Sequence, residues 1–128
     1  MNIVNRNIKN VFFIFAFSHL IIWTLVPSLT NKNLPLDTIE ALAWGSNLDW
    51  GFNKHPPMSA FFPEVFFQNF GSQDWAYYLL SQIFVLIAFY FVFKLANEVL
   101  GNIKLSLISV LLLESIYFYN FTTPEFNV

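Results

Sequence analysis

The sequence predicts an all-α integral membrane protein with about three transmembrane helices and a large extracytoplasmic first loop that contains short interfacial helices. Three observations predict this fold. First, 56% of the 128 residues are hydrophobic and 11% are charged, whereas a typical globular sequence carries about a quarter charged residues. Second, the mean hydropathy is +0.54. Third, the chain contains charge-free stretches long enough to cross a hydrocarbon core of about 30 Å at about 1.5 Å per helical residue.

The composition also excludes several classes of function. The net charge is −2, and the chain lacks the clustered Lys and Arg that nucleic-acid binding requires, so no nucleic-acid partner is expected. The chain contains no Cys, which excludes a disulfide framework, a thiolate metal site and a cysteine nucleophile. The lipid bilayer is the expected environment.

One membrane domain, residues 1–128, is expected. The second span lies between Asp74 and Lys94, while the third has Lys104 at its start and Glu114 inside it. Gly101 is placed to end the second helix in a left-handed cap. The expected segments are a cytoplasmic start (1–10), span one (11–29), an extracytoplasmic loop (30–74), span two (75–93), a cytoplasmic turn (94–102), span three (103–121) and the start of a second outer loop (122–128).

The basic residues predict the orientation, because positive charges favour the cytoplasmic side of a membrane. Arg6 and Lys9 precede the first span, and Lys94 and Lys104 flank the turn between the second and third. The N-terminus is therefore expected in the cytoplasm. A basic start followed by an apolar stretch is also typical of a signal peptide. The long apolar run and the poor cleavage site in VPSLTN favour a retained anchor.

The extracytoplasmic loop opens with a predicted short helix over residues 33–45. Asn33 or Asp37 can cap it, Pro35 suits its first turn, and Gly45 is expected to end it.

Two carboxylates share one face of this predicted helix. Asp37 and Glu40 are three residues apart, and Trp44 follows one turn later. The pattern has a plain interpretation as a capping-box variant that satisfies backbone N–H groups. The alternative is that one carboxylate is a general base or a metal ligand at the membrane surface.

Farther along the same loop, Lys54 and His55 precede two prolines, Pro56 and Pro57. The prolines make a rigid bend, and Pro57 can open another helix. Lys54 and His55 are either ordinary loop residues or a pair that holds a lipid-linked phosphate. Aromatic residues around this bend make an apolar surface suited to the membrane interface: Phe61, Phe62, Phe66, Phe67 and Phe70, with Trp50 and Trp75 as anchors.

Two further acids complete the candidate set. Glu114 falls inside the third predicted span, and an intramembrane carboxylate is a functional hypothesis by default. It is equally well explained as a protonated group bonded to Ser115 or to a neighbouring helix. Glu125 is expected to emerge on the same outer side as Asp37, or to be a helix-start residue after Pro124.

Several ordered motifs resemble the N-terminal part of bacterial glycosyltransferase family 39 proteins, which are related to dolichyl-phosphate-mannose protein mannosyltransferases and to the aminoarabinose transferases of lipid A. The resemblance covers roughly residues 36–128. Its specific parts are Asp37-x-x-Glu40-x-x-x-Trp44, Trp50-Gly51-Phe52-x-Lys54-His55-Pro56-Pro57 and Asn120-Phe121-Thr122-Thr123-Pro124-Glu125-Phe126-Asn127.

The resemblance implies a GT-C-type enzyme of the bacterial inner membrane that transfers a sugar, with inversion, from a polyprenyl-phosphate-linked donor to a lipid, glycan or protein acceptor outside the membrane. It implies that Asp37 is catalytic with Glu40 beside it, that Glu125 is the second-loop acid, and that Lys54 and His55 lie near the carrier phosphate. In some members a divalent metal is used there. No nucleotide cofactor is expected, because the donor is embedded in the membrane.

Members of that family have many more spans than this chain, so a truncated N-terminal fragment is expected. In the family the first-loop carboxylate more often has an adjacent second acid, whereas Thr38 follows Asp37 here. The alternative function is a small non-catalytic membrane protein that binds lipid or a partner through its Phe-rich outer loop.

Overall fold

The computed structural model describes residues 3–52 and 56–126. These residues form helices, turns and bends, with no β-strand among them. The fold is therefore all-α over the described part of the chain, as predicted. The elements in chain order are α1 (Ile3–Thr30), α2 (Leu36–Gly45), α3 (Met58–Phe70), α4 (Asp74–Leu100), α5 (Ile103–Glu114) and a short 3₁₀ turn, η1 (Tyr117–Tyr119).

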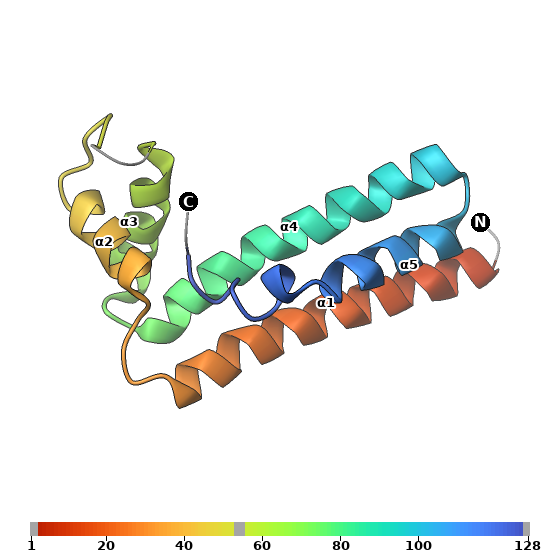
Figure 1. Ribbon diagram of the computed structural model, residues 1–128, viewed down its shortest axis with the longest axis horizontal. Helices are drawn as coiled ribbons and strands as arrows, with labels where there is room; N and C mark the ends of the chain where they lie inside the picture. The colour runs from red at the N-terminus through yellow and green to blue at the C-terminus, as the bar shows by residue number, and fades with distance from the viewer. Residues whose placement is uncertain (1–2, 53–55, 127–128) are drawn as a thin grey trace.

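Two long helices, α1 and α4, lie side by side and form the frame of the molecule (Figure 1). Both are long and apolar enough to cross a membrane. Helix α5 packs against both of them. The core between the three helices is aromatic: Phe12 stacks on Phe93 with ring centroids 4.5 Å apart, and Phe89 and Val110 are fully buried. Much of the outward-facing surface of α1 and α4 is apolar, as a lipid-facing surface requires.

The third expected span, 103–121, is not one continuous helix. Helix α5 has 12 residues and ends at Glu114, so it rises about 18 Å, which is short of a hydrocarbon core. The helix ends there because the Asn120 side chain, by donating from Nδ2 at 2.8 Å, takes up the Glu114 carbonyl. The chain then turns through η1 and continues along α4 as an irregular segment, residues 120–126, here called the C-terminal segment.

Helices α2 and α3 form a hairpin beside the first turns of α4 (Figure 1). Helix α3 begins directly after Pro57, as predicted. The predicted caps of α2 are wrong: Pro35 occupies the N-cap position with no side-chain hydrogen bond, and Asp37 lies inside the first turn. No side chain of the α2 sequence itself therefore caps its N-terminus.

Two glycines meet particular demands of the backbone. Gly101 ends α4 with φ of 61°, in the left-handed region, so its predicted role is confirmed. Gly45 ends α2 as predicted, but for a different reason. A Cβ at Gly45 would lie 2.6 Å from the Ala60 carbonyl oxygen and 2.9 Å from Glu64 Cβ. Gly45 therefore allows α2 and α3 to approach closely.

We expect Gly45→Ala to loosen the α2–α3 hairpin, because the added methyl group overlaps a backbone carbonyl that cannot move without shifting α3. The expected loss of stability is about 1–3 kcal/mol, measured by thermal unfolding of the purified chain in detergent. Gly51→Ala is the matched control, since a Cβ there meets nothing within 4 Å. Equal stability of the two variants would contradict the close approach.

Candidate functional site

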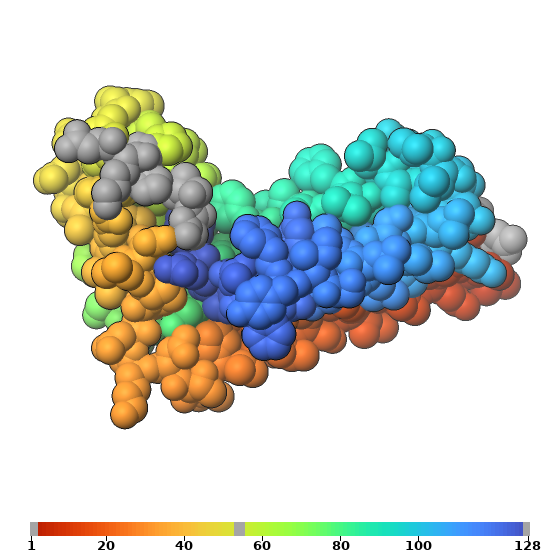
Figure 2. All heavy atoms as spheres, viewed as in Figure 1, coloured from red at the N-terminus to blue at the C-terminus, as the bar shows by residue number. Residues whose placement is uncertain are grey.

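A groove opens where α3, α4 and the C-terminal segment meet. Its volume is about 730 Å³. Figure 2 shows the surface hollowed between the α2–α3 lobe and the later part of α4. Its lining is predominantly apolar and includes Phe62, Phe84, Phe118 and Phe126. Such a groove is suited to a hydrocarbon chain.

Among the described residues that line the groove, one is acidic, and it is Glu125. Its Oε1 accepts a hydrogen bond from the backbone N–H of Asp37 at 3.4 Å. The first N–H groups of a helix have no partner within the helix and carry partial positive charge. Glu125 thus replaces the missing cap of α2 from a distant part of the chain and joins the groove to the helix that carries Asp37.

The other acids predicted for the outer site, Asp37 and Glu40, do not line this groove. Both are partly buried on α2. Trp44, on the same helix, stacks on Phe52 with centroids 5.5 Å apart. Lys54 and His55 lie outside the described residues. The structure thus brings Glu125 to the backbone of Asp37.

The second feature is a polar cluster in the helix core, and it contains Glu114. The side chain of His19, on α1, is 1% exposed, and its Nδ1 lies 3.1 Å from each carboxylate oxygen of Glu114. Only the contact with Oε1 has hydrogen-bond geometry, so Oε2 is left without a directed bond. On its other side, His19 Nε2 lies 2.9 Å from Oε1 of Gln82 on α4.

These contacts fix how the protons are arranged. The carbonyl oxygen of Gln82 is an acceptor, so His19 Nε2 must donate to it. One further proton then lies between His19 Nδ1 and Glu114, on either group. In both arrangements the pair has no net charge, which is the form in which ionisable groups are tolerated inside a membrane.

The cluster continues to the C-terminal segment. Gln82 Nε2 donates to Thr123 Oγ1 at 3.3 Å, and the Ser81 hydroxyl donates to the Thr123 carbonyl oxygen. Thr123 is two residues before Glu125. The polar core of the helices therefore anchors the segment that carries the groove carboxylate.

Sequence reasoning found Glu114 but did not find His19 or Gln82. Glu114 is bonded to a neighbouring helix, through His19, and the Ser115 hydroxyl donates instead to the Leu112 carbonyl oxygen. The signal for His19 was present, because it is the ionisable residue inside a 21-residue stretch, 11–31, that lacks Asp, Glu, Lys and Arg. Gln82 is likewise a polar residue in the middle of span two.

A metal centre was one expectation for the loop. Within the described ranges, no group of three or more His, Cys, Asp or Glu residues is arranged to hold a metal ion. Lys54 and His55, beside which the metal was expected, lie outside those ranges.

Comparison with known proteins identifies the family. Residues 54–128, more than half of the chain, match the family model described as dolichyl-phosphate-mannose-protein mannosyltransferase. The chain belongs to this family. No curated protein and no solved structure matches it significantly.

Membership of the mannosyltransferase family supports a glycosyltransferase-like function associated with a membrane. The described lining of the groove falls entirely inside the matched residues, as do Gln82, Glu114 and Glu125. Asp37 and Glu40 lie before the match. The structural link between Asp37 and Glu125 therefore connects the unmatched loop to the family segment.

The polar cluster predicts that Glu114→Gln is tolerated better than Glu114→Leu. Gln keeps an acceptor for His19, whereas Leu leaves a buried imidazole nitrogen without a partner, at a cost of about 1–3 kcal/mol. Thermal unfolding of the purified chain in detergent measures the difference. Glu98→Gln and Glu98→Leu are the matched controls, because Glu98 is exposed on α4. Equal stability of the two Glu114 variants would contradict a contribution of the His19–Glu114 bond.

Proposed function

We propose that this chain acts in the transfer of a sugar from a polyprenyl-phosphate-linked donor to a lipid, glycan or protein acceptor on the extracytoplasmic side of a bacterial inner membrane. One observation carries the proposal: an apolar groove, formed by family-matched residues, has the Glu125 carboxylate in its lining and meets the N-terminus of the helix that bears Asp37. An apolar groove with a few polar groups in its lining is suited to an amphipathic lipid donor.

In the proposed reaction, an acceptor hydroxyl oxygen attacks the anomeric carbon of the sugar. The new carbon–oxygen bond forms on the face opposite the phosphate, and the bond to the phosphate oxygen breaks with its electron pair staying on the phosphate. The configuration is inverted. The hydroxyl proton passes to a carboxylate acting as general base, and Asp37 is our candidate for this role.

The leaving phosphate is stable without protonation, so charge neutralisation is the main requirement on that side. Lys54 and His55 are the proposed phosphate-binding residues. They directly precede Pro56 in the sequence, and Pro56 lines the groove.

Glu125 has a different proposed role. Its carboxylate is already bonded to the α2 N-terminus, so we assign it to positioning Asp37 and the groove wall relative to each other. Glu40, one turn after Asp37, is the second acid of the same helix. We assign it to the site as a second negative charge beside the proposed base.

The test is transfer of radiolabelled sugar from polyprenyl-phosphate carrier to endogenous acceptors in membranes that express this chain. Asp37→Asn should abolish transfer, because the amide cannot accept the acceptor's proton, while expression and membrane insertion stay unchanged. Glu125→Gln should reduce transfer less than Glu125→Leu, because Gln keeps an acceptor for the Asp37 N–H. Asp49→Asn is the matched control, since Asp49 is exposed in the same loop.

Unchanged transfer in Asp37→Asn would contradict the assignment of the base. If the wild-type chain inserts stably and transfers no sugar, the transferase proposal is wrong for this chain alone. Binding through the Phe-rich loop then becomes the better hypothesis, and it predicts that changes at Phe61, Phe62, Phe66 and Phe67 matter while Asp37→Asn is tolerated.

A further inference from the structure

A polar pocket lies at the end of the helix bundle remote from α2 and α3, where α1 begins, α4 ends and α5 begins (Figure 1). Its volume is about 450 Å³. Its polar lining comes from all three helices: Asn5 and Lys9 of α1, Asn97 of α4, and Asn102 and Lys104 at the start of α5. Nothing in the proposed transfer reaction uses this end of the molecule.

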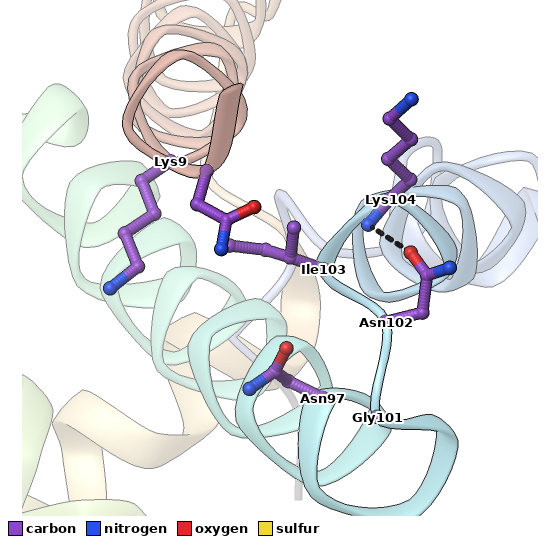
Figure 3. A pocket seen from close by; sticks show the side chains of 7 residues that line it. Lys9, Asn97, Gly101, Asn102, Ile103 and Lys104 are labelled. Carbon is purple, nitrogen blue, oxygen red and sulfur yellow. Dashed lines mark hydrogen bonds between the residues drawn. The ribbon is translucent and has the colours of Figure 1, made fainter. Parts of the chain in front are cut away.

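Figure 3 shows the arrangement of these groups. The Asn97 amide points into the space between α4 and α1, with Lys9 on one side and Lys104 on the other, and both lysine ammonium groups extend toward the periphery. Asn102 Oδ1 accepts from the Lys104 backbone N–H at 3.0 Å, which orients its amide at the rim. The pocket therefore offers amide N–H donors at its centre and flexible cations at its edge.

The charge at this end is strongly positive. Arg6, Lys9, Lys94 and Lys104 are exposed here, against one carboxylate, Glu98. Such a balance favours an anionic ligand.

The polar pocket adjoins an apolar crevice between α1 and α4. The crevice has a volume of about 320 Å³ and shares Lys9, Asn97 and Ile103 with the polar pocket. Its remaining walls are mainly aromatic and include Phe13 and Tyr90, which are 50% and 45% exposed. Lys94 and Glu98 also belong to the lining, next to the polar pocket. Along both helices the lining changes from polar to aromatic toward the middle of the bundle, which is the order of headgroup and acyl chain in a bilayer.

We propose that this end of the bundle binds one anionic phospholipid. The phosphate of its headgroup lies among Asn97, Asn102 and the two lysines, Lys9 and Lys104, and an acyl chain lies in the crevice against Phe13 and Tyr90. Basic pockets between transmembrane helices at the membrane surface bind anionic headgroups in this way.

A water-soluble anion would occupy only the polar pocket. It would satisfy the amides and the cations but leave the aromatic crevice unfilled. A zwitterionic phospholipid would fill the crevice but gain no net attraction from the four cations. An anionic phospholipid matches both parts.

The test measures lipid affinity of the purified full chain in detergent by native mass spectrometry. The probes are phosphatidylglycerol and phosphatidylcholine with identical acyl chains. Wild-type protein should bind phosphatidylglycerol more tightly. Lys9→Gln and Lys104→Gln should each lower that affinity about fivefold, in line with the contribution of one basic residue near an anionic lipid, and leave phosphatidylcholine binding unchanged.

Lys32→Gln is the matched control, because it removes the same charge from an exposed position in the loop at the opposite end. Its affinity for phosphatidylglycerol should equal that of the wild type. The proposal is overturned if Lys32→Gln lowers affinity as much as Lys9→Gln, if the two lipids bind equally, or if millimolar inorganic phosphate displaces phosphatidylglycerol. None of these outcomes depends on glycosyltransferase activity.

Discussion

The hydrogen bonds of His19 are the interaction on which the rest of the described structure depends. Inside a bilayer the hydrophobic effect does little to hold helices together, so packing and polar contacts between helices decide their arrangement. His19 contacts Gln82 on α4 and Glu114 on α5, which makes it the polar junction of all three core helices. An imidazole, an amide and a carboxyl group would each be costly alone in hydrocarbon, and together they share donors and acceptors. The aromatic packing of Phe12, Phe89 and Phe93 then fills the space around them.

This junction also determines how the chain leaves the helix core. Helix α5 stops at Glu114, and the C-terminal segment returns along α4, held by Ser81 and Gln82 at Thr123. Its path brings Glu125 to α2, whose own sequence provides no cap. The groove exists because this irregular segment lies against α4 opposite α3. The anchoring of the C-terminal segment in the polar core and the shape of the groove proposed for the lipid-linked donor are therefore consequences of the same contacts.

The sequence predicted what depends on local chemistry. The apolar stretches predicted α1 and α4. Gly101 predicted the end of α4, because the left-handed backbone conformation that ends a helix favours glycine. Both helices run past the charge-free stretches, since Lys, Glu and Asn at a membrane surface continue a helix without difficulty. What failed depends on contacts between distant segments: the end of α5 at Glu114, the cap of α2 by Glu125, and the pairing of His19 with Gln82 and Glu114. Hydropathy shows that Glu114 is unusual, but only the packing of α5 against α1 identifies its partner.

The two ends of the bundle differ in charge, and this difference separates their proposed ligands. Around the groove, the loop between α1 and α4 carries more acids than bases, whereas the opposite end carries four cations and one carboxylate. An anionic phospholipid held by the cations would keep that end at the anionic cytoplasmic surface, in agreement with the orientation that the positive charges predict. The groove would then open on the other side, toward a lipid-linked sugar. Because the groove and the phospholipid site share no described lining residue, a phospholipid at one does not compete with a lipid donor at the other. The bound phospholipid would fix the orientation that the proposed reaction requires.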